Sequence, residues 1–329
     1  MALARDLEEK KLTMKKLISY IFPIYNEYGN IDHLYKTMKE LLNQNNKYDY
    51  EMIFVNDGSQ DNSLEKLLQL QKVDERVTVI NFARNFGHQV AVTAGLDHVN
   101  GDAVIIMDSD MQDPPHVSFD LVKKWEEGYD VVYAQRRSRR DSILKRITAN
   151  VFYRLLDKLA DVDIPRNTGD FRLLDRRVVK QLNKFREHNR FLRGLVSYVG
   201  FKQTGVLFDR DKRLSGKTGY PLKRMVKFAI DGLLGFSWTP IRLITKLGYF
   251  ISLLSFIGII YAIAMKFLRP DVTVPGWTFI VISILFIGGI QLVTLGVLGN
   301  YIGRIYTESQ NRPLYIIENV YRSNKSRKG

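Results

Sequence analysis

The sequence predicts an α/β fold in which a doubly wound, mostly parallel sheet is followed by interfacial amphipathic helices and a two-helix transmembrane hairpin. In the first half of the chain, short β-branched and aromatic runs alternate with stretches of helical spacing. Near the C-terminus, two apolar runs each exceed 20 residues, a length that crosses a hydrocarbon core of roughly 30 Å. Together they predict a large N-terminal domain and a membrane anchor.

The expected strands are apolar runs in the N-terminal part of the chain. They cover residues 17–24, 51–55, 77–82, 103–107 and 130–134. One helix face is expected between the first two runs, at Ile31, Leu34, Met38 and Leu41. Because strands and helices alternate, the sheet should be mostly parallel and should bind ligands at the carboxyl ends of its strands.

Polar residues follow four of these runs. The clusters are Tyr25-Asn26-Glu27, Asn56-Asp57-Gly58-Ser59, Arg84-Asn85-Phe86-Gly87 and Asp108-Ser109-Asp110. Because the carboxyl ends of parallel strands share one edge of a sheet, the clusters should converge there. No GxGxxG follows the first run and no GxxxxGK(S/T) occurs, so the dinucleotide-binding and P-loop classes lack their fingerprints.

The most informative stretch runs from Asp108 to Pro115. Alternation along an extended segment points Asp108 and Asp110 the same way, and Gln112 can follow them. Neighbouring carboxylates repel, and a divalent cation with oxygen ligands relieves that repulsion. The stretch therefore predicts a Mg²⁺ or Mn²⁺ site at Asp108, Asp110 and Gln112, although two aspartates in a turn more often form a cap.

Composition limits the classes of partner. The net charge of +14 and the isoelectric point near 9.7 indicate nucleic acid, anionic lipid headgroups or phosphorylated substrates. The absence of cysteine excludes disulfides, zinc–thiolate sites and thiol nucleophiles.

The membrane segment is predicted at 247–267 and 277–298, two runs joined by a short link that contains proline and glycine. Basic residues concentrate after Gly299, so the positive-inside rule places both termini and the large domain on the cytoplasmic side of the plasma (inner) membrane. This is a multi-pass arrangement.

Domain boundaries follow from these patterns. We expect an extension at 1–16, a catalytic domain at 17–219, an interfacial segment at 220–245, two membrane helices within 246–299 and a basic cytoplasmic tail at 300–329. Basic amphipathic patterns occur at 142–159 and 222–236. The second stretch is expected to lie on the membrane, whereas the first fits membrane contact and core packing equally well.

Several motifs carry a family resemblance. They are Pro23-Ile24-Tyr25-Asn26-Glu27, Val55-Asn56-Asp57-Gly58-Ser59, Arg84-Asn85-Phe86-Gly87 and the stretch from Asp108 to Pro115. Together they resemble the family 2 glycosyltransferases of GT-A fold. Gly169-Asp170-Phe171-Arg172-Leu173-Leu174-Asp175-Arg176 and Tyr301-Ile302-Gly303-Arg304-Ile305-Tyr306 narrow the resemblance to bacterial polyprenyl-phosphate glycosyltransferases, relatives of dolichyl-phosphate mannose synthase. It spans about residues 17–320.

The resemblance implies a UDP-sugar donor. It assigns the nucleotide-sugar to Pro23, Tyr25, Glu27, Asp57, Arg84, Asn85, Gly87 and Asp108. It assigns the metal and diphosphate to Asp108, Asp110 and Gln112, with Asp110 also at the catalytic centre. Without it, Tyr25 and Glu27 would be interpreted as a strand-end turn and 57–59 as a turn with a helix cap. The histidines lack metal-binding spacing and are interpreted as surface or packing residues, with His88 near the diphosphate.

The acceptor side is predicted from charge. A phosphate monoester is already ionised at pH 7, so a lipid phosphate needs positioning cations more than a general base. Arg210, Arg213 and Lys217 resemble the family's basic acceptor loop, and Arg172 is assigned to the same phosphate. The loop carries Gly219 where lysine is common in the family, and a solvated basic loop is the alternative.

Asp170 is predicted as the carboxylate nearest the reacting phosphate. It would act as a base or orient Arg172. The alternative is a structural ion pair with Arg172 or Arg176.

The expected reaction is an inverting hexosyl transfer from a UDP-sugar to polyprenyl (undecaprenyl) phosphate, with glucose favoured over N-acetylglucosamine or a modified sugar. A processive polysaccharide synthase is the lesser alternative, because no QxxRW motif occurs.

The non-enzyme alternative is a membrane-tethered nucleic-acid-binding protein. Such a protein would interleave aromatic and basic residues, whereas the aromatics here concentrate in apolar runs. We also predict a homo-oligomer and no nucleic-acid partner.

Overall fold

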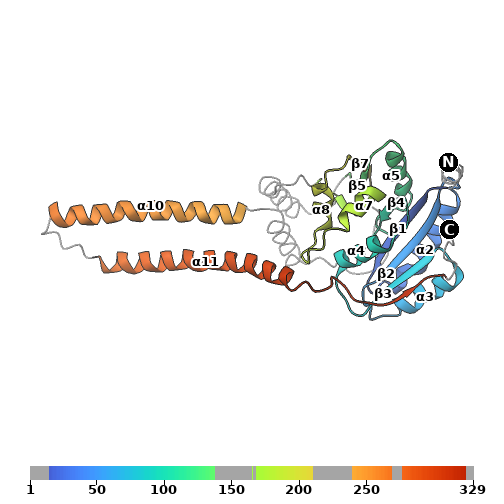
Figure 1. Ribbon diagram of the computed structural model, residues 1–329, viewed down its shortest axis with the longest axis horizontal. Coiled ribbons are helices and arrows are strands. Elements are labelled where there is room, and N and C mark those ends of the chain that lie inside the picture. The colour runs from blue at the N-terminus through green and yellow to red at the C-terminus, as the bar shows by residue number, and fades with distance from the viewer. Residues whose placement is uncertain (1–14, 138–164, 166–167, 210–238, 269–275, 324–329) are drawn as a thin grey trace, which may run out of the picture. The chain divides into compact units, whose positions relative to one another are not determined.

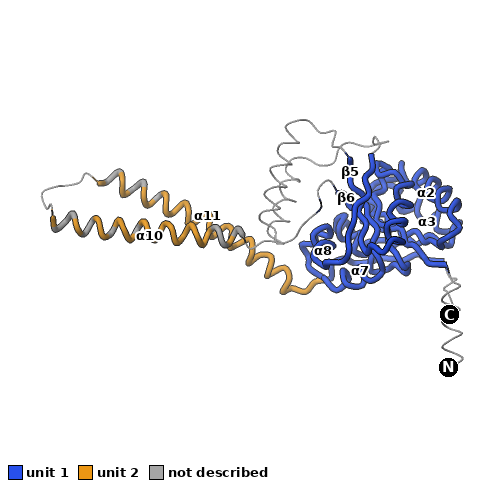
Figure 2. Tube along the Cα trace, turned by 90° about the horizontal axis from the view of Figure 1, so that it is seen from above, with its two compact units in different colours: residues 1–153, 162–225, 313–329 blue, residues 154–161, 226–312 orange. Residues whose placement is uncertain are grey.

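The computed structural model describes residues 15–137, 165, 168–209, 239–268 and 276–323. The chain divides into two compact units, which Figure 2 draws in different colours. The first unit comprises residues 1–153, 162–225 and 313–329, and the second comprises residues 154–161 and 226–312. The first contains the sheet, and the second contains two long apolar helices.

The first unit is built on a mixed sheet of eight strands in the order β7-β5-β6-β4-β1-β2-β3-β8 (Figure 1). The strands are β1 (Leu17–Ile24), β2 (Asp49–Asn56), β3 (Val77–Phe82), β4 (Ala103–Ile106), β5 (Val131–Arg136), β6 (Thr168–Asp175), β7 (Gln203–Phe208) and β8 (Ile317–Tyr321). Its helices are α2 (Tyr28–Asn43), α3 (Ser63–Val73), α4 (His88–His98), α5 (Val117–Glu126), α7 (Arg176–Leu182) and α8 (Leu192–Tyr198).

The centre of the sheet is parallel. β1 pairs with β2 on one side and β4 on the other, and β2 pairs with β3. The predicted strands are confirmed as β1 to β5, with boundaries within two residues of those expected. Because the chain passes to β2 and β3 before it crosses to β4, a topological switch point lies between β1 and β4. Open α/β sheets bind ligands there. β6 and β8 run antiparallel to their neighbours, so the sheet is mixed.

Two helices show how the predicted core forms. α2 buries Ile31, Leu34 and Met38 as expected, but the next buried residue is Leu42, while Leu41 is half-buried. α4 packs closely on β1, because a Cβ at Gly95 would lie 2.4 Å from the Cγ2 atom of the buried Ile21. This close contact fixes the helix whose first turn enters the candidate site.

The predicted tail at 300–329 is partly regular structure. α11 (Trp277–Ser309) continues into it, and β8 then pairs with β3. The strand was not predicted, because Glu318 and Asn319 interrupt its apolar pattern.

The second unit contains α10 (Thr239–Leu268) and α11. Among the described residues, one stretch, Phe286–Ser309 of α11, is long and apolar enough to cross a membrane, and none of it is buried in a protein core. The apolar stretch of α10, Ile244–Gly258, is shorter. The predicted association with a membrane is thus supported. The second membrane-spanning helix of the predicted hairpin is not shown. The amphipathic stretches predicted at 142–159 and 222–236 lie outside the described residues.

Gly95→Ala should destabilise the first unit, because its new methyl group would overlap Ile21 and overpacking costs about 1–3 kcal/mol. We expect the thermal unfolding midpoint, followed by circular dichroism in detergent, to fall by about 2–10 °C. Gly29→Ala in α2 is the control, since a Cβ there meets no atom within 4 Å and alanine favours helix. An unchanged midpoint for Gly95→Ala would contradict the close packing.

Candidate active site

The candidate site lies at the switch point, beyond the carboxyl ends of β1 and β4. The Met107 N–H donates to the Ile21 carbonyl oxygen at 3.0 Å, and Ser109 Oγ donates to the Pro23 carbonyl oxygen at 3.2 Å. These bonds tie the loop after β4 to the end of β1. The polar clusters that follow the two strands are therefore brought together, as the sequence predicts.

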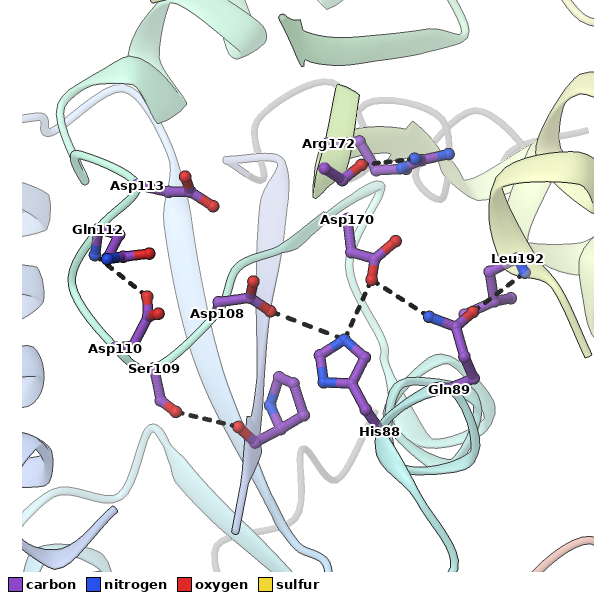
Figure 3. A network of polar contacts seen from close by, with 12 residues as sticks. His88, Gln89, Asp108, Ser109, Asp110, Gln112, Asp113, Asp170, Arg172 and Leu192 are labelled. Carbon is purple, nitrogen blue, oxygen red and sulfur yellow. Dashed lines mark hydrogen bonds and ion pairs between the residues drawn. The ribbon is translucent and has the colours of Figure 1, made fainter. Parts of the chain in front are cut away.

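The two aspartates of this loop do not point the same way. β4 ends at Ile106, so the alternation of an extended strand does not reach them. Asp110 Oδ1 accepts the backbone N–H of Gln112 at 3.1 Å, whereas Asp108 points toward His88 (Figure 3). The cap-like turn that the sequence allowed is thus present at Asp110.

Asp170 on β6 is a buried carboxylate at the centre of a polar network. Gln89 Nε2 donates to Asp170 Oδ2 at 3.1 Å, and His88 Nε2 lies at the same distance from that oxygen. Arg193 Nε donates to Asp170 Oδ1 at 2.8 Å. Gln89 Oε1 also accepts the backbone N–H of Leu192 at 3.1 Å. The network therefore joins β6, α4 and α8 around one carboxylate (Figure 3).

The charges of this network stabilise one another. Burial alone would raise the pKa of Asp170, but Arg193 and His88 overcome this effect and hold that pKa well below its usual range. Burial would lower the pKa of His88, but Asp170 and Asp108 raise it to about 9. At pH 7 the site therefore contains an Asp170 carboxylate between an imidazolium and a guanidinium.

The negative charge of Asp108 is less well compensated than that of Asp170. Burial raises its pKa, which His88 opposes and the nearby Asp170 and Asp110 carboxylates reinforce. Its Oδ1 atom is buried and accepts no hydrogen bond from the described residues, and His88 Nε2 lies 3.7 Å away. A buried carboxylate oxygen in this state is a suitable ligand for a divalent cation.

Comparison with known proteins identifies the family. A family model described as Glycosyl transferase family 2 matches residues 19–182, which contain most of the sheet and Asp170. The uncharacterized glycosyltransferase YkcC of Bacillus subtilis (strain 168) is 47% identical over 92% of this chain and 94% of its own length. The chain belongs to glycosyl transferase family 2.

Two further proteins resemble this chain to different degrees. The SfII prophage-derived bactoprenol glucosyl transferase of Shigella flexneri is 41% identical, over 93% of this chain and 99% of that protein. The solved structure of glucosyl-3-phosphoglycerate synthase from Mycobacterium tuberculosis with Mn²⁺ and UDP is 18% identical, with a TM-score of 0.43 over 70% of this chain and 81% of that chain. This second likeness is too slight to support a conclusion.

In this glycosyltransferase, Asp57 holds the loop that precedes α4. Its Oδ1 accepts the Phe86 N–H at 2.6 Å, and its Oδ2 accepts the Gly87 N–H at 2.9 Å and Asn85 Nδ2 at 3.0 Å. The carboxylate therefore fixes the start of α4, and with it His88. Asp57 caps neither α3 nor α4, and its contact with a nucleotide stays a prediction.

The remaining predicted donor residues lie along the same edge. Tyr25 is 44% exposed, and the Glu27 N–H donates to Ser63 Oγ at 3.0 Å. The Arg84 guanidinium carbon lies 4.1 Å from the centroid of the Phe86 ring. Their contact with a nucleotide-sugar stays a prediction.

The ion pair that was the alternative for Asp170 is not present in the described part of the chain, whereas an orienting effect on Arg172 stays a prediction. Among the described residues, no hydrogen bond or ion pair joins it to Arg172 or Arg176, which donate to backbone carbonyls at 2.8 and 2.7 Å. Arg193 is the cation that sequence patterns did not reveal, because it lies 23 residues downstream, outside the motif. His88 was interpreted as a surface or packing residue near the diphosphate, but it also contacts Asp170. Its position directly after the polar cluster 84–87 is the sequence feature that could have indicated this role.

The structure does not describe the predicted acceptor loop. Arg210, Arg213 and Lys217 lie outside the described residues, so their role stays a prediction. Arg172 is described and is buried, and burial lowers its pKa to about 10 although Asp170 opposes the shift. It remains a cation at pH 7.

Arg193→Met should destabilise the catalytic unit by about 3–5 kcal/mol at pH 7, because it removes a charged partner from the buried Asp170. The double variant Asp170→Asn/Arg193→Met should be more stable than Arg193→Met alone, since the uncompensated carboxylate is gone. Urea unfolding in detergent measures both of these variants and the single variant Asp170→Asn. Arg177→Met, with a side chain 72% exposed, is the control with the smallest loss. Simple addition of the two single losses would rule out this coupling.

Proposed function

We propose that this glycosyltransferase transfers glucose from UDP-glucose to polyprenyl phosphate, with inversion at the anomeric carbon. The observation that carries the proposal is 41% identity to a bactoprenol glucosyl transferase over 93% of this chain. That alignment extends far beyond the family match at 19–182, so it includes residues of the C-terminal helices. The proposed acceptor is bactoprenol (undecaprenyl) phosphate.

The donor would lie at the carboxyl ends of β1 to β4. The residues proposed to hold its nucleotide and sugar directly are Pro23, Tyr25, Glu27, Arg84, Asn85, Gly87 and Asp108. Support comes from their position after the carboxyl ends of β1, β3 and β4, the edge of the sheet at which α/β folds bind nucleotides. For Asp57 we propose an indirect role, because its carboxylate oxygens already accept hydrogen bonds from the loop before α4.

Mg²⁺ or Mn²⁺ would be held by Asp108, Asp110 and Gln112. The buried Asp108 Oδ1, which lacks a hydrogen bond among the described residues, fits this role. No group of three or more His, Cys, Asp or Glu in the described part of the chain could hold the ion alone, so the donor diphosphate would supply further oxygens. The bound ion would neutralise the diphosphate and the charge that develops on departing UDP.

The acceptor phosphate is ionised at pH 7 and can attack without first losing a proton. A phosphate oxygen forms the bond to the anomeric carbon while the bond to UDP breaks, and UDP leaves with the electron pair. An α-linked donor therefore gives a β-linked product. The residues proposed to hold the acceptor phosphate are Arg172, Arg210, Arg213 and Lys217.

For Asp170 we propose an electrostatic and orienting role. Its lowered pKa makes it a weak proton acceptor at pH 7, which disfavours the general-base alternative. Its contacts instead keep His88 charged and close to Asp108. The imidazolium is then available to the negative charge of the diphosphate.

The proposal includes two membrane crossings, at 247–267 in α10 and 277–298 in α11. These helices contain 30 and 33 residues, and each is longer than the roughly 20 residues that span a bilayer. Basic residues after Gly299 favour cytoplasmic termini, a cytoplasmic catalytic domain at 17–219 and location in the plasma (inner) membrane. The homo-oligomer stays a prediction.

Full-length protein in liposomes that contain undecaprenyl phosphate should move label from UDP-glucose into the organic phase. UDP-N-acetylglucosamine and UDP-galactose test the choice of sugar. Asp108→Asn should lower the rate by about 100-fold or more, because it weakens both cation binding and charge stabilisation. The matched control is Asp120→Asn, an exposed aspartate on α5, which should retain the wild-type rate.

Two results would contradict the proposal. One is the absence of lipid-bound label from UDP-glucose in the wild-type assay. The other is equal transfer by wild-type and Asp108→Asn protein at a limiting concentration of Mg²⁺ or Mn²⁺ that still supports the wild-type rate.

A further inference from the structure

The chain returns to the catalytic unit directly after its last helix. α11 ends at Ser309, and Asn311 follows with φ +46, its N–H donating to the Glu308 carbonyl oxygen at 3.0 Å. Left-handed asparagine and the following Pro313 both terminate a helix. Ser309 and Tyr315 are six positions apart, so this connection spans at most about 20 Å even when extended.

Residues 315–322, which we call the clasp, are held along the edge of the sheet. β8 forms an antiparallel ladder with β3, and the Ala83 N–H donates to the Ile316 carbonyl oxygen at 3.1 Å. The buried Asn81 donates from Nδ2 to Glu318 Oε2 at 2.6 Å. The clasp is therefore bound by main-chain and side-chain contacts.

Tyr315 is the anchor of the clasp. Its ring stacks on Phe82 with centroids 5.2 Å apart and an interplanar angle of 17°. Its hydroxyl donates to Asp97 Oδ2 at 2.6 Å, and Arg186 Nη1 lies 2.9 Å from the same carboxylate. Burial, reinforced by Asp97, raises the pKa of Tyr315, so the phenol remains a donor throughout the physiological range.

The clasp holds the end of α4 that lies opposite the candidate site. Asp97 and His98 form the last positions of this helix, and Arg322 Nη2 donates to the His98 carbonyl oxygen at 3.4 Å. His88 and Gln89 in its first turn contact the site. The helix has 11 residues, so its two ends are about 15 Å apart. One rigid helix therefore connects the clasp with the site.

We propose that the clasp limits the distance between the end of α11 and the active site, and thereby positions the catalytic unit for an acceptor phosphate in the bilayer. This inference rests on the proposed function. A lipid acceptor cannot leave the bilayer, so the site must reach the headgroup plane. Without the clasp, α10 and α11 would be joined to the catalytic unit by the chain before α10 alone. The effective concentration of the site at the membrane surface would then fall.

Comparing two acceptors tests this role of Tyr315 as a positioning residue. In liposomes, Tyr315→Ala should lower kcat/KM for undecaprenyl phosphate by at least about tenfold. For a water-soluble short-chain prenyl phosphate, kcat/KM should stay within about twofold, as should KM for UDP-glucose, because the site itself is intact. Tyr315→Phe, which keeps the stacked ring, should lose less. Tyr198→Ala, at a tyrosine 62% exposed outside the clasp, should behave as wild type with both acceptors.

A disulfide tests the clasp independently of activity, because the native chain has no cysteine. Ile80 and Val320 are register partners in β3 and β8, and the Cα spacing of such pairs suits a disulfide. Ile80→Cys/Val320→Cys should cross-link within one chain, migrate as a monomer on a non-reducing gel and retain lipid transfer when oxidised. Cross-linked dimers would overturn the inference, because β8 would then come from a second copy. Loss of transfer on oxidation would also overturn it, because the clasp would then have to open.

The possible failures are distinguishable. Wild-type protein that transfers to neither acceptor contradicts the proposed function, whereas the gel result still reports whether the clasp closes within one chain. If wild-type protein is active, an equal loss for both acceptors in Tyr315→Ala, or no loss for either, overturns the positioning role.

Discussion

Compensation of negative charge at the switch point is the constraint on which the rest of the site depends. Asp108, Asp110 and Asp170 lie close together beyond the carboxyl ends of β1 and β4, and buried carboxylates are costly without a cation or hydrogen-bond donors. Arg193 and His88 compensate Asp170, which draws α8 and the first turn of α4 to β6. Asp108 retains a buried oxygen without a donor among the described residues. The incompletely compensated carboxylate is thus the one for which we propose a cation bound to the donor diphosphate.

The central fold could be predicted from local pattern alone. The runs that became β1 to β5 are short, apolar and separated by helical spacing, and a parallel order brings their ends to one edge whatever the details of packing. The same reasoning correctly brought the loop after β4 to the end of β1, where Ser109 contacts Pro23. It failed for the direction of Asp108 and Asp110, because β4 ends at Ile106 and the loop that follows has its own turn geometry.

Partners that meet through tertiary packing could not be predicted. His88 and Arg193 reach Asp170 from helices 82 and 23 positions away in sequence, and no spacing rule connects them. The strand β8 could not be predicted from the sequence for a different reason. Its five residues contain polar side chains and lie where basic charge suggested a tail. Its place is fixed by pairing with β3 and by Tyr315, which depend on residues more than 200 positions earlier in the chain.

The central claim is that Asp108 and Asp110 hold a divalent cation against the donor diphosphate. The most direct measurement is a crystal structure with UDP and Mn²⁺, in which anomalous scattering locates the ion. A manganese peak between the diphosphate and the two aspartates, close to His88, is the predicted result. A peak away from both aspartates, or UDP bound far from the ends of β1 and β4, would contradict the claim.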